Sequence, residues 1–545
     1  MAAVSKSENR RRAALSEMKV RSFLGRTLGL LVGSTIIASA PSLLSGEPPE
    51  LAPAVATDGA TDEVVELVQA PSMPLDALLQ PLTEDKLFRD ATVALQVVDV
   101  RTGEEVYGWH QDEALVPAST MKVVTAAAAL KELGPSYRWS TDLTTDGKID
   151  AKGSLTGNLY VVGSGDPEMV IETLWKLVYD LKLEGVNEVS GDIVFDDTRM
   201  TRERSIPGWK KRADLENGPA YDPSLGALSL NHNTVAVVVG PSETVGGPAR
   251  AVLETAAPGI LILESELTTT APGGRRSVVL DREVSGRQMT LKLSGNIPQG
   301  SGAQRYYRSV PDPSAYFQAA MADMLRQQGI KVRGKWRDDA APEDGKLLAR
   351  HRSSPLANVL ATTNKQSNNF MAEQVLKTLG WEVEGEGSTE AGLRVVGRYL
   401  QSLGIAPEEY TLVNGSGLAR DVRIRPSHLT AVLVDMEHDN QVGAEFRASL
   451  AIGGRDGTLW ARFREEDQVG RLRGKTGTIN GVHCLTGYID SDGGDRYAFA
   501  FLVNDLPYSI ARARQAHDRF ADVLFAQGRP LPLMEETEKA SSGAR

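Results

Sequence analysis

Three segments near the carboxyl end of the chain alternate apolar and polar residues, and hairpin turns join them. The segments are residues 472–478, 482–490 and 496–503, with Asn480-Gly481 in the first turn and Ser491-Asp492-Gly493-Gly494 in the second. Turn residues of these types supply the backbone angles that tight hairpins need, and the alternation places every second side chain on one face of a sheet. The sequence therefore predicts an antiparallel meander in this region.

A hairpin and an alanine-rich helix are predicted on the amino-terminal side. Residues 91–100 and 105–110 are extended apolar runs joined by a short polar turn. In the helix that follows, Pro117 lies where a first-turn proline is tolerated, residues 123–133 are rich in Ala and Leu, and Gly134 fits a carboxyl-terminal cap. Apolar periodicity predicts further helices at 314–328, 367–379, 390–403 and 509–527.

Short strands dominate the middle of the chain, from residue 142 to about 302. They are predicted at 159–162, 191–195, 234–239 and 288–293, which indicates an all-β insertion closed by the helix 314–328. The fold class is therefore predicted as α+β with a large β-rich insertion. We expect residues 76–138 and 343–533 to form the main domain, and residues 139–342 to form the insertion, divided into two subdomains. The sequence shows neither an internal repeat nor a glycine-rich phosphate loop, so it gives no support to a solenoid or a nucleotide-binding fold.

The first forty residues predict an export signal. Basic residues precede an apolar run at 28–38, and Ala38-Ser39-Ala40 has the small-x-small pattern that signal peptidase accepts. The run is short for a membrane span, so a cleaved signal at 1–40 is favoured over a retained anchor. A start at Met18 would give a more typical signal, and both starts remain open. Residues 41–75 predict a flexible linker and residues 534–545 a disordered tail.

Composition excludes several classes of function. The 41% hydrophobic and 24% charged fractions are typical of a soluble globular enzyme, and the net charge of −11 argues against a nucleic-acid partner. The seven histidines lack metal-ligand spacing. The single cysteine, Cys484, excludes an intrachain disulfide and a cysteine zinc site, and we expect it to be a small buried residue in a strand. No metal or cofactor is therefore expected.

A nucleophile with an adjacent base is predicted at the start of the alanine-rich helix, in Ser119-Thr120-Met121-Lys122. Residues three apart on a helix project from one face, so the lysine amine can lie beside the serine hydroxyl. A lysine acts as a base near neutral pH only if burial or another cation disfavours its charged form, and Lys475 could supply that cation. The motif alone is weak, because Ser16-Glu17-Met18-Lys19 in the leader also fits it.

Two further motifs follow in an order that makes coincidence implausible. Ser367-Asn368-Asn369 opens a predicted helix, where Ser367 alone would be read as an amino-terminal cap. Lys475-Thr476-Gly477-Thr478 lies on the strand before the Asn480-Gly481 hairpin, where the extended backbone can bind a peptide and the glycine allows close approach. Alone, Lys475 would be read as a protective lysine on an edge strand. The order of the three motifs predicts one active site.

These motifs resemble those of the low-molecular-mass class C penicillin-binding proteins, the D-alanyl-D-alanine carboxypeptidase/endopeptidase group known as peptidase family S13. The long separation between Ser119 and Ser367 is similar to that created by the family's large inserted domains. The resemblance spans roughly residues 76–530 and implies a transpeptidase/β-lactamase-like fold, an antiparallel sheet flanked by helices. Other phrases similar to family signatures lie at 159–167, 191–197, 207–209, 228–231 and 415–420.

The resemblance also implies roles. Ser119 would attack the carbonyl of the penultimate D-alanine of a peptidoglycan peptide, Lys122 would accept its proton, and Ser367 with Lys475 would pass a proton to the leaving amine. The N–H groups of Ser119 and Thr478 would form the oxyanion hole. The implied substrate-binding residues are Asn369, Thr476, Gly477, Thr478, Ser416, Arg420 and Asp214.

Two positions depart from the family pattern. Some relatives recognise the free amino-acid end of the diaminopimelate stem with an arginine, matched here by Arg420, and with an acidic residue a few positions after Pro-Gly-Trp. The nearest match to the acidic residue, Asp214, lies about one place late. Asn414 stands where the family usually has aspartate before Gly-Ser-Gly.

The predicted partners are peptidoglycan peptides as substrates and β-lactam antibiotics as inhibitors, with no nucleic acid. Membrane association is expected to be peripheral at most, or through an uncleaved signal, and the expected location is the periplasm or cell-wall space. Two alternatives are a serine β-lactamase, which differs in how fast its acyl-enzyme hydrolyses, and a catalytically inactive wall-binding scaffold.

Overall fold

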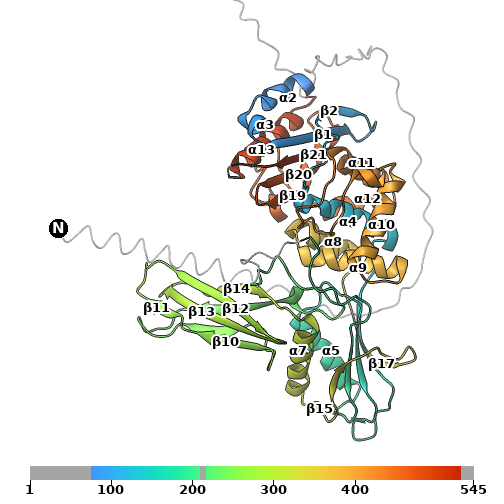
Figure 1. Ribbon diagram of the computed structural model, residues 1–545, viewed down its shortest axis with the longest axis vertical. Coiled ribbons are helices and arrows are strands. Elements are labelled where there is room, and N and C mark those ends of the chain that lie inside the picture. The colour runs from blue at the N-terminus through green and yellow to red at the C-terminus, as the bar shows by residue number, and fades with distance from the viewer. Residues whose placement is uncertain (1–74, 209–216, 508, 529–545) are drawn as a thin grey trace, which may run out of the picture. The chain divides into compact units, whose positions relative to one another are not determined.

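Strands from both ends of the described chain build one six-stranded antiparallel sheet (Figure 1). The computed structural model describes residues 75–208, 217–507 and 509–528. The strand order is β18-β19-β20-β21-β1-β2, and β1 pairs along its whole length with β21. The bounds are β1 Thr92–Asp99, β2 Glu105–Trp109, β18 Ala451–Ile452, β19 Leu472–Ile479, β20 Val482–Asp490 and β21 Arg496–Asn504.

Helices cover both faces of this sheet, which explains why β20 and β21 are buried almost throughout. On one face, Cys484, Tyr488 and Leu502 pack into a core with one set of helices. On the other face, Leu485, Phe499 and the remaining alternate residues pack with a second set. The first set is α4 Met121–Leu133, α8 Leu356–Gln366, α9 Asn369–Glu384, α10 Thr389–Ser402, α11 Pro426–His438 and α12 Gly443–Ser449, and the second is α2 Leu75–Thr83, α3 Lys86–Asp90 and α13 Ala511–Phe525.

The predicted antiparallel elements are confirmed. The meander is β19, β20 and β21, and the amino-terminal hairpin is β1 and β2. The alanine-rich helix is α4, and the Gly134 N–H closes its end on the Leu130 carbonyl. Cys484 is fully buried in β20, as expected of a small apolar residue. The predicted α+β class is the class observed.

The segment between α4 and α8 forms separate sheets (Figure 1). One has the order β16-β7-β5-β3-β17, a second β15-β6-β4, and a third β14-β8-β9; in the fourth, β10-β13-β11, strand β12 also pairs with β13. Helix α7, Pro313–Gln327, corresponds to the predicted closing helix. The strands are β3 Ser140–Thr145, β4 Ser154–Leu155, β5 Leu159–Gly163, β6 Glu188–Val189, β7 Ile193–Asp196, β8 Thr234–Gly240, β9 Arg250–Leu253, β10 Leu261–Ser265, β11 Thr268–Thr270, β12 Ser277–Ser285, β13 Gln288–Pro298, β14 Gln304–Ser309, β15 Lys331–Val332, β16 Trp336–Asp338 and β17 Lys346–Arg352.

The expectation that the insertion is all-β before α7 is wrong, because α5, Ile171–Leu183, lies within it. Its buried residues Leu174, Leu177, Val178 and Leu181 follow the three-and-four spacing of one helix face. They join the core of the inserted sheets together with α7. The insertion therefore combines sheets and helices around its own apolar core.

The division into domains stays a prediction. One observation concerns the predicted end of the insertion at residue 342. Strand β17 pairs with β3, so the segment 346–352 completes a sheet of the insertion. The predicted signal 1–40, nearly all of the linker 41–75, the tail 534–545 and Asp214 lie outside the described residues. None of the helices in the described ranges has both the length and the apolarity that a bilayer crossing requires.

Candidate active site

Ser119 lies in a short 3₁₀ turn, η1 (Ala118–Thr120), that leads directly into α4. The preceding residue, Ala118, has a φ of 47°, a left-handed conformation that is costly for a residue with a Cβ. Gly417 presses on this turn: a Cβ placed on it would lie 1.9 Å from the Ala118 carbonyl oxygen. The Gly-Ser-Gly phrase thus packs against the backbone that presents the serine, and only glycine fits there.

Lys122 lies beside the serine with three hydrogen-bond partners. Its Nζ is 2.8 Å from Ser119 Oγ, 2.8 Å from Asn369 Oδ1 and 2.7 Å from the Ser416 carbonyl oxygen. The amide and carbonyl oxygens can only accept. A neutral amine has two N–H groups and one lone pair, so it must donate to these two oxygens and turn its lone pair to the Ser119 hydroxyl. The geometry orients Lys122 as a base toward Ser119.

The protonation of Lys122 fits this role. Burial lowers the pKa of Lys122 to about 7, while the Glu373 carboxylate opposes the change by favouring the charged amine. A base of this strength is available near neutral pH. Of the two causes that the sequence left open, burial or a second cation, burial is the one that lowers the pKa of Lys122. The pKa of Lys475 is lowered well below its usual value, first by burial and then by the positive charge of Lys122.

Ser367 occupies the junction between α8 and α9 and not the first turn of a helix, so its reading as an amino-terminal cap is wrong. It has a φ of 57° and caps the end of α8, whereas Asn368 caps α9 by accepting the Met371 N–H. The left-handed residue lets the chain reverse between two packed helices. The Ser367 hydroxyl is thereby left to accept a 2.8 Å hydrogen bond from Lys475 Nζ.

Asn369 begins α9 and connects two parts of the chain. Its Oδ1 accepts from Lys122, and its Nδ2 donates to the carbonyl oxygen of Tyr221 in the insertion at 2.8 Å. Both ends of this amide are therefore engaged, which fixes which side faces the lysine. A cavity of about 320 Å³ adjoins this point, lined by residues 366–370 and by Tyr221, His232 and Tyr307.

Strand β19 carries Lys475 and Gly477 toward the nucleophile turn. Lys475 is fully buried, and a Cβ on Gly477 would lie 2.6 Å from the Pro117 carbonyl oxygen and 3.1 Å from Ser119 N. The alternate residues have their own partners: Thr476 Oγ1 donates to Thr458 Oγ1, and Thr478 Oγ1 lies 2.8 Å from His483 Nδ1. The glycine allows the strand to pack directly beside Ser119.

The structure brings together most of the residues that the sequence singled out. Ser119, Lys122, Asn369 and Ser416 share the contacts of one amine, and Lys475 joins Ser367. Arg420 is exposed and donates to the Asn480 carbonyl, so it lies at the turn after β19 and not among these groups. Asn414 donates its amide N–H to the Pro207 carbonyl at 2.9 Å, a bond that an ionised aspartate could not make.

Glu373 was missed by the sequence reasoning. It lies one helical turn after Asn369, is fully buried, and accepts the backbone N–H groups of Gly415 and Ser416 at 3.1 and 2.8 Å. No local sequence pattern marked this carboxylate, because the backbone groups that it binds lie in a distant segment of the chain. Tyr221 was missed as well, because its backbone contact with Asn369 has no sequence signature.

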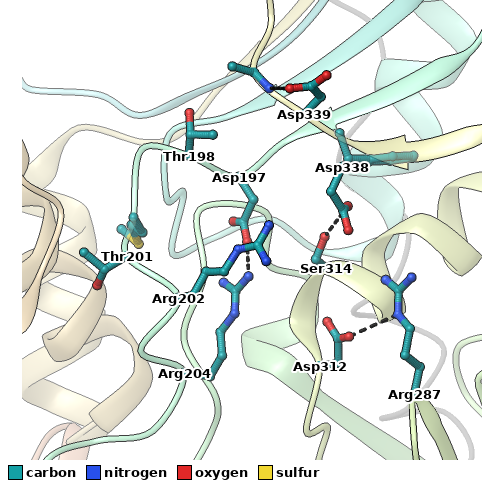
Figure 2. Close-up of a pocket in the computed structure, with 13 residues that line it drawn as sticks. Asp197, Thr198, Thr201, Arg202, Arg204, Arg287, Asp312, Ser314, Asp338 and Asp339 are labelled. Carbon is teal, nitrogen blue, oxygen red and sulfur yellow. Dashed lines mark hydrogen bonds and ion pairs between the residues drawn. The ribbon is translucent and has the colours of Figure 1, made fainter.

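A larger cavity, of about 800 Å³, lies in the insertion (Figure 2). Two ion pairs line it, Arg204 with Asp197 and Arg287 with Asp312, and Ser314 donates to Asp338. Figure 2 shows the three pairs, with a dashed line joining the two members of each. The cavity lining contains no serine or lysine pair of the kind found at Ser119, so size does not locate the chemistry.

The sequence was also compared with protein families and with known proteins. The sequence profile of the D-Ala-D-Ala carboxypeptidase 3 (S13) family matches residues 71–525. A D-alanyl-D-alanine carboxypeptidase from an Actinomadura species is 31% identical over 482 residues, which cover 85% of each chain. The D-alanyl-D-alanine carboxypeptidase DacB of Haemophilus influenzae is 26% identical over 434 residues, covering 77% of this chain and 86% of that protein.

A solved structure supports the fold. The crystal structure of penicillin binding protein 4 (dacB) from Haemophilus influenzae superposes with a TM-score of 0.70 at 24% identity, covering 83% of this chain and 99% of that one. The expected sheet flanked by helices, with its large insertion, is therefore a fold that a penicillin-binding protein adopts. The profile match and the Actinomadura relative both extend over most of the sequence, and the chain belongs to the D-Ala-D-Ala carboxypeptidase 3 (S13) family.

Proposed function

We propose that this protein is a serine D-alanyl-D-alanine carboxypeptidase that forms an acyl-enzyme on Ser119. The observation that carries the proposal is the placement of the Lys122 amine, 2.8 Å from Ser119 Oγ, with its other two partners limited to accepting. Burial keeps a substantial fraction of this amine neutral near pH 7. A serine with such a base is activated for attack on a carbonyl.

In the acylation step, Ser119 Oγ attacks the carbonyl carbon of the penultimate D-alanine. The hydroxyl proton passes to Lys122 Nζ as the C–O bond forms, and the bond to the terminal D-alanine nitrogen breaks. That proton then passes from Lys122 through the Ser367 hydroxyl, which Lys475 holds, to the leaving nitrogen, so that Lys122 is neutral again. The N–H groups of Ser119 and Thr478 receive the developing oxyanion, and one such donor is typically worth about 3 kcal/mol.

Substrate binding is assigned to the surroundings of β19. Thr476 and Thr478 bind the terminal carboxylate, Gly477 allows the substrate backbone to approach, and Asn369 holds a substrate amide in place of the Tyr221 carbonyl. Ser416 contributes through its carbonyl on Lys122. Arg420 and Asp214 are proposed to recognise the free amino-acid end of a diaminopimelate stem.

Water completes the cycle by hydrolysing the acyl-enzyme, with neutral Lys122 placed to accept its proton. The same chemistry applied to a cross-linked peptide is a DD-endopeptidase activity, which we include in the proposal. A β-lactam would leave Ser119 acylated, since its strained amide takes the place of the D-alanyl-D-alanine bond. The location follows from the substrate: an exported protein of the periplasm or cell-wall space, associated with the membrane only peripherally or through an uncleaved signal.

Digestion of purified muropeptides tests the activity. Monomeric and cross-linked dimeric muropeptides are incubated separately with the protein and with S119A, and the products are identified by mass spectrometry. We expect loss of one D-alanine from pentapeptide monomers and cleavage of dimers, both absent with S119A. Intact substrates after prolonged incubation would refute the proposal.

Fluorescent penicillin separates the two alternatives. We expect stoichiometric labelling that persists after free penicillin is removed, with a mass increase on the peptide containing Ser119. Rapid nitrocefin turnover without persistent labelling would indicate a β-lactamase instead. Absence of any labelling would indicate an inactive scaffold.

A further inference from the structure

A buried carboxylate lies directly behind the proposed base. Glu373 is fully buried in α9, and its two oxygens accept separate backbone N–H groups: Oε1 from Ser416 at 2.8 Å and Oε2 from Gly415 at 3.1 Å. A buried carboxylate is costly unless donors satisfy it. The mechanism proposed above gives Glu373 no task, so its cost is unexplained by that mechanism.

The loop that Glu373 holds is the loop that positions Lys122. The Ser416 carbonyl accepts the 2.7 Å hydrogen bond from Lys122 Nζ, and the Gly415 carbonyl accepts the Thr125 hydroxyl at 2.8 Å. Glu373 therefore grips the N–H side of a loop whose carbonyl side faces α4. Moving this loop would move one of the two acceptors that direct the Lys122 lone pair at Ser119.

Glu373 supplies a negative charge close to the two buried lysines, Lys122 and Lys475. Lys122 and Lys475 are both buried and interact electrostatically, and Glu373 is the carboxylate whose charge acts on Lys122. Burial raises the pKa of Glu373, but its partners are donors, which favour the ionised form. With Glu373 ionised, one lysine can keep its proton in a neutral group of three. The other lysine is then free to be the base.

The wider surroundings add one more cation. Lys377, one turn further along α9, also feels the Glu373 charge. Facing Lys377 from the insertion are Glu203, Arg204 and Asp197, and Lys377 Nζ donates to the Glu203 carbonyl and lies 3.3 Å from Thr201 Oγ1. Lys377 thus has acidic groups of the insertion nearby, whereas Glu373 is the carboxylate that acts on Lys122.

We propose that Glu373 is a positioning residue of the acylation step, which fixes the Gly415–Ser416 loop beneath Lys122 and supplies the buried negative charge that balances one of the two lysines. This inference rests on the proposed function of Lys122 as the base for Ser119. It assigns a task to a residue outside the three sequence motifs.

The test is the pH dependence of penicillin acylation in E373Q. Removing the negative charge makes the Lys122 cation less stable, so the acid limb of the rate profile should move to lower pH by about one unit or more. The plateau rate should fall at least tenfold, because the neutral amine is a weaker base and Gln offers one acceptor for two N–H groups. An unshifted acid limb would overturn the proposal, whatever the plateau does.

Two comparisons separate charge from folding. E373D and E373N have side chains of the same length and differ in charge. If the acid limb of the rate profile shifts in E373N and not in E373D, the shift is due to the lost charge, and this comparison holds even if E373Q folds poorly. The control is T378V, because Thr378 lies on the same helix as Glu373 and is buried to the same degree. T378V removes the hydroxyl that accepts the Trp139 indole N–H at 2.8 Å. T378V should lower the Tm and leave the limb in place, and a limb shift in T378V equal to that of E373Q would contradict the assignment.

The wild-type protein distinguishes the two levels of the argument. If wild type is not acylated at Ser119 by penicillin, the proposed function fails. If wild type is acylated with a clear acid limb, and neither E373Q nor E373N moves it, the role of Glu373 fails and the proposed function stands.

Discussion

In the helix-flanked six-stranded sheet region, Lys122, Lys475 and Glu373 are at most 1% exposed, whereas two ion pairs that join strands of the insertion lie at its surface. Arg350 and Asp142 pair across β17 and β3 with the arginine 38% exposed, and Lys292 with Glu283 across β13 and β12 with both partners more exposed still. Burying a charge costs several kcal/mol, at about the scale of a domain's total stability, while a surface pair contributes little.

This difference shows that the protein tolerates the unfavourable burial of charged groups in the region of the candidate active site. Lys122 contacts the Ser119 hydroxyl, Lys475 contacts the Ser367 hydroxyl, and Glu373 holds the loop that contacts Lys122. The desolvation that makes these buried groups costly also lowers the pKa of Lys122 to about 7. The insertion has no comparable group of buried lysines among its described residues. Lys377 lies at the border: it is fully buried, but it contacts Thr201 and the Glu203 carbonyl and not Ser119.

The comparison between Lys122 and Lys377 gives the largest expected effect. K122M should reduce the rate of penicillin acylation by about 10³-fold, within the range that loss of a general base produces. K377M removes an equally buried lysine from the neighbouring helix and should change the rate by less than about tenfold, although it lowers the Tm. Stopped-flow acylation of both variants checks this, and equal losses in both would mean that the contact with Ser119 does not distinguish Lys122 from another buried lysine.

A methyl group on Gly477 should have the second largest effect. In G477A the new Cβ meets the Pro117 carbonyl at 2.6 Å, so β19 must move away from the nucleophile turn. A displacement near 1 Å costs about 10²-fold in rate when reacting groups are misaligned. G240A in β8 of the insertion is the control, because nothing lies within 4 Å of its new Cβ. Acylation rates near wild type in both variants would contradict the close packing of β19 on Ser119.

A buried histidine of the six-stranded sheet region, His517, should make the stability of the protein sensitive to acid. His517 is fully buried with neither ring nitrogen bonded within the described chain, and it stacks on His483. Burial, then His483 and two arginines, lower the pKa of His517 well below its usual value. The unfolded chain therefore binds a proton below pH 6.5 that the folded chain refuses, and stability falls as pH drops through that value.

H517F tests this assignment. It should remove about 2 kcal/mol of the stability lost between pH 6.5 and pH 5, since each pH unit of proton binding by the unfolded state is worth about 1.4 kcal/mol. Denaturant unfolding at pH 5 and pH 8 measures the difference. A variant that loses as much stability as wild type between these pH values would show that His517 is not a source of the sensitivity.

The smallest effect is expected at the surface of the insertion. R350A breaks the pair with Asp142, whose two hydrogen bonds are 2.7 and 2.5 Å long, and should lower the free energy of unfolding by less than about 1 kcal/mol. Acylation of Ser119 should be unchanged. A rate loss of tenfold or more would mean that the strand pair β3–β17 communicates with the active site, and the contrast between the two regions would fail.

The sequence predicted the elements whose pattern repeats locally. Strands β19 to β21 and the hairpin β1–β2 were predicted because alternation and turn residues occur together in each. Helix α5 was missed although its buried residues are regularly spaced. Its exposed side carries Trp175 and Tyr179, which stack on each other at 44% and 39% exposure, so large aromatic residues interrupt the polar face that Lys176 and Asp180 form.

The site was predicted as three motifs but not as a set of contacts. The order of Ser119, Ser367 and Lys475 was sufficient to place them in one site. The left-handed conformation of Ser367 was not predictable, because it arises from the packing of α8 against α9. Glu373 was missed for a similar reason: its partners Gly415 and Ser416 are distant in sequence, and nothing near residue 373 marks its carboxylate as buried.

The pairing of β1 with β21 has a consequence for folding of the chain during synthesis. A nascent chain contains the serine early, yet the strand that carries Lys475 and the strand that joins β1 are among the last parts to be synthesised. Until then Lys122 is solvated and keeps its proton, so the hydroxyl has no base. Ser119 therefore gains its base only once the segments that carry Asn369, Ser416 and Lys475 have folded around α4.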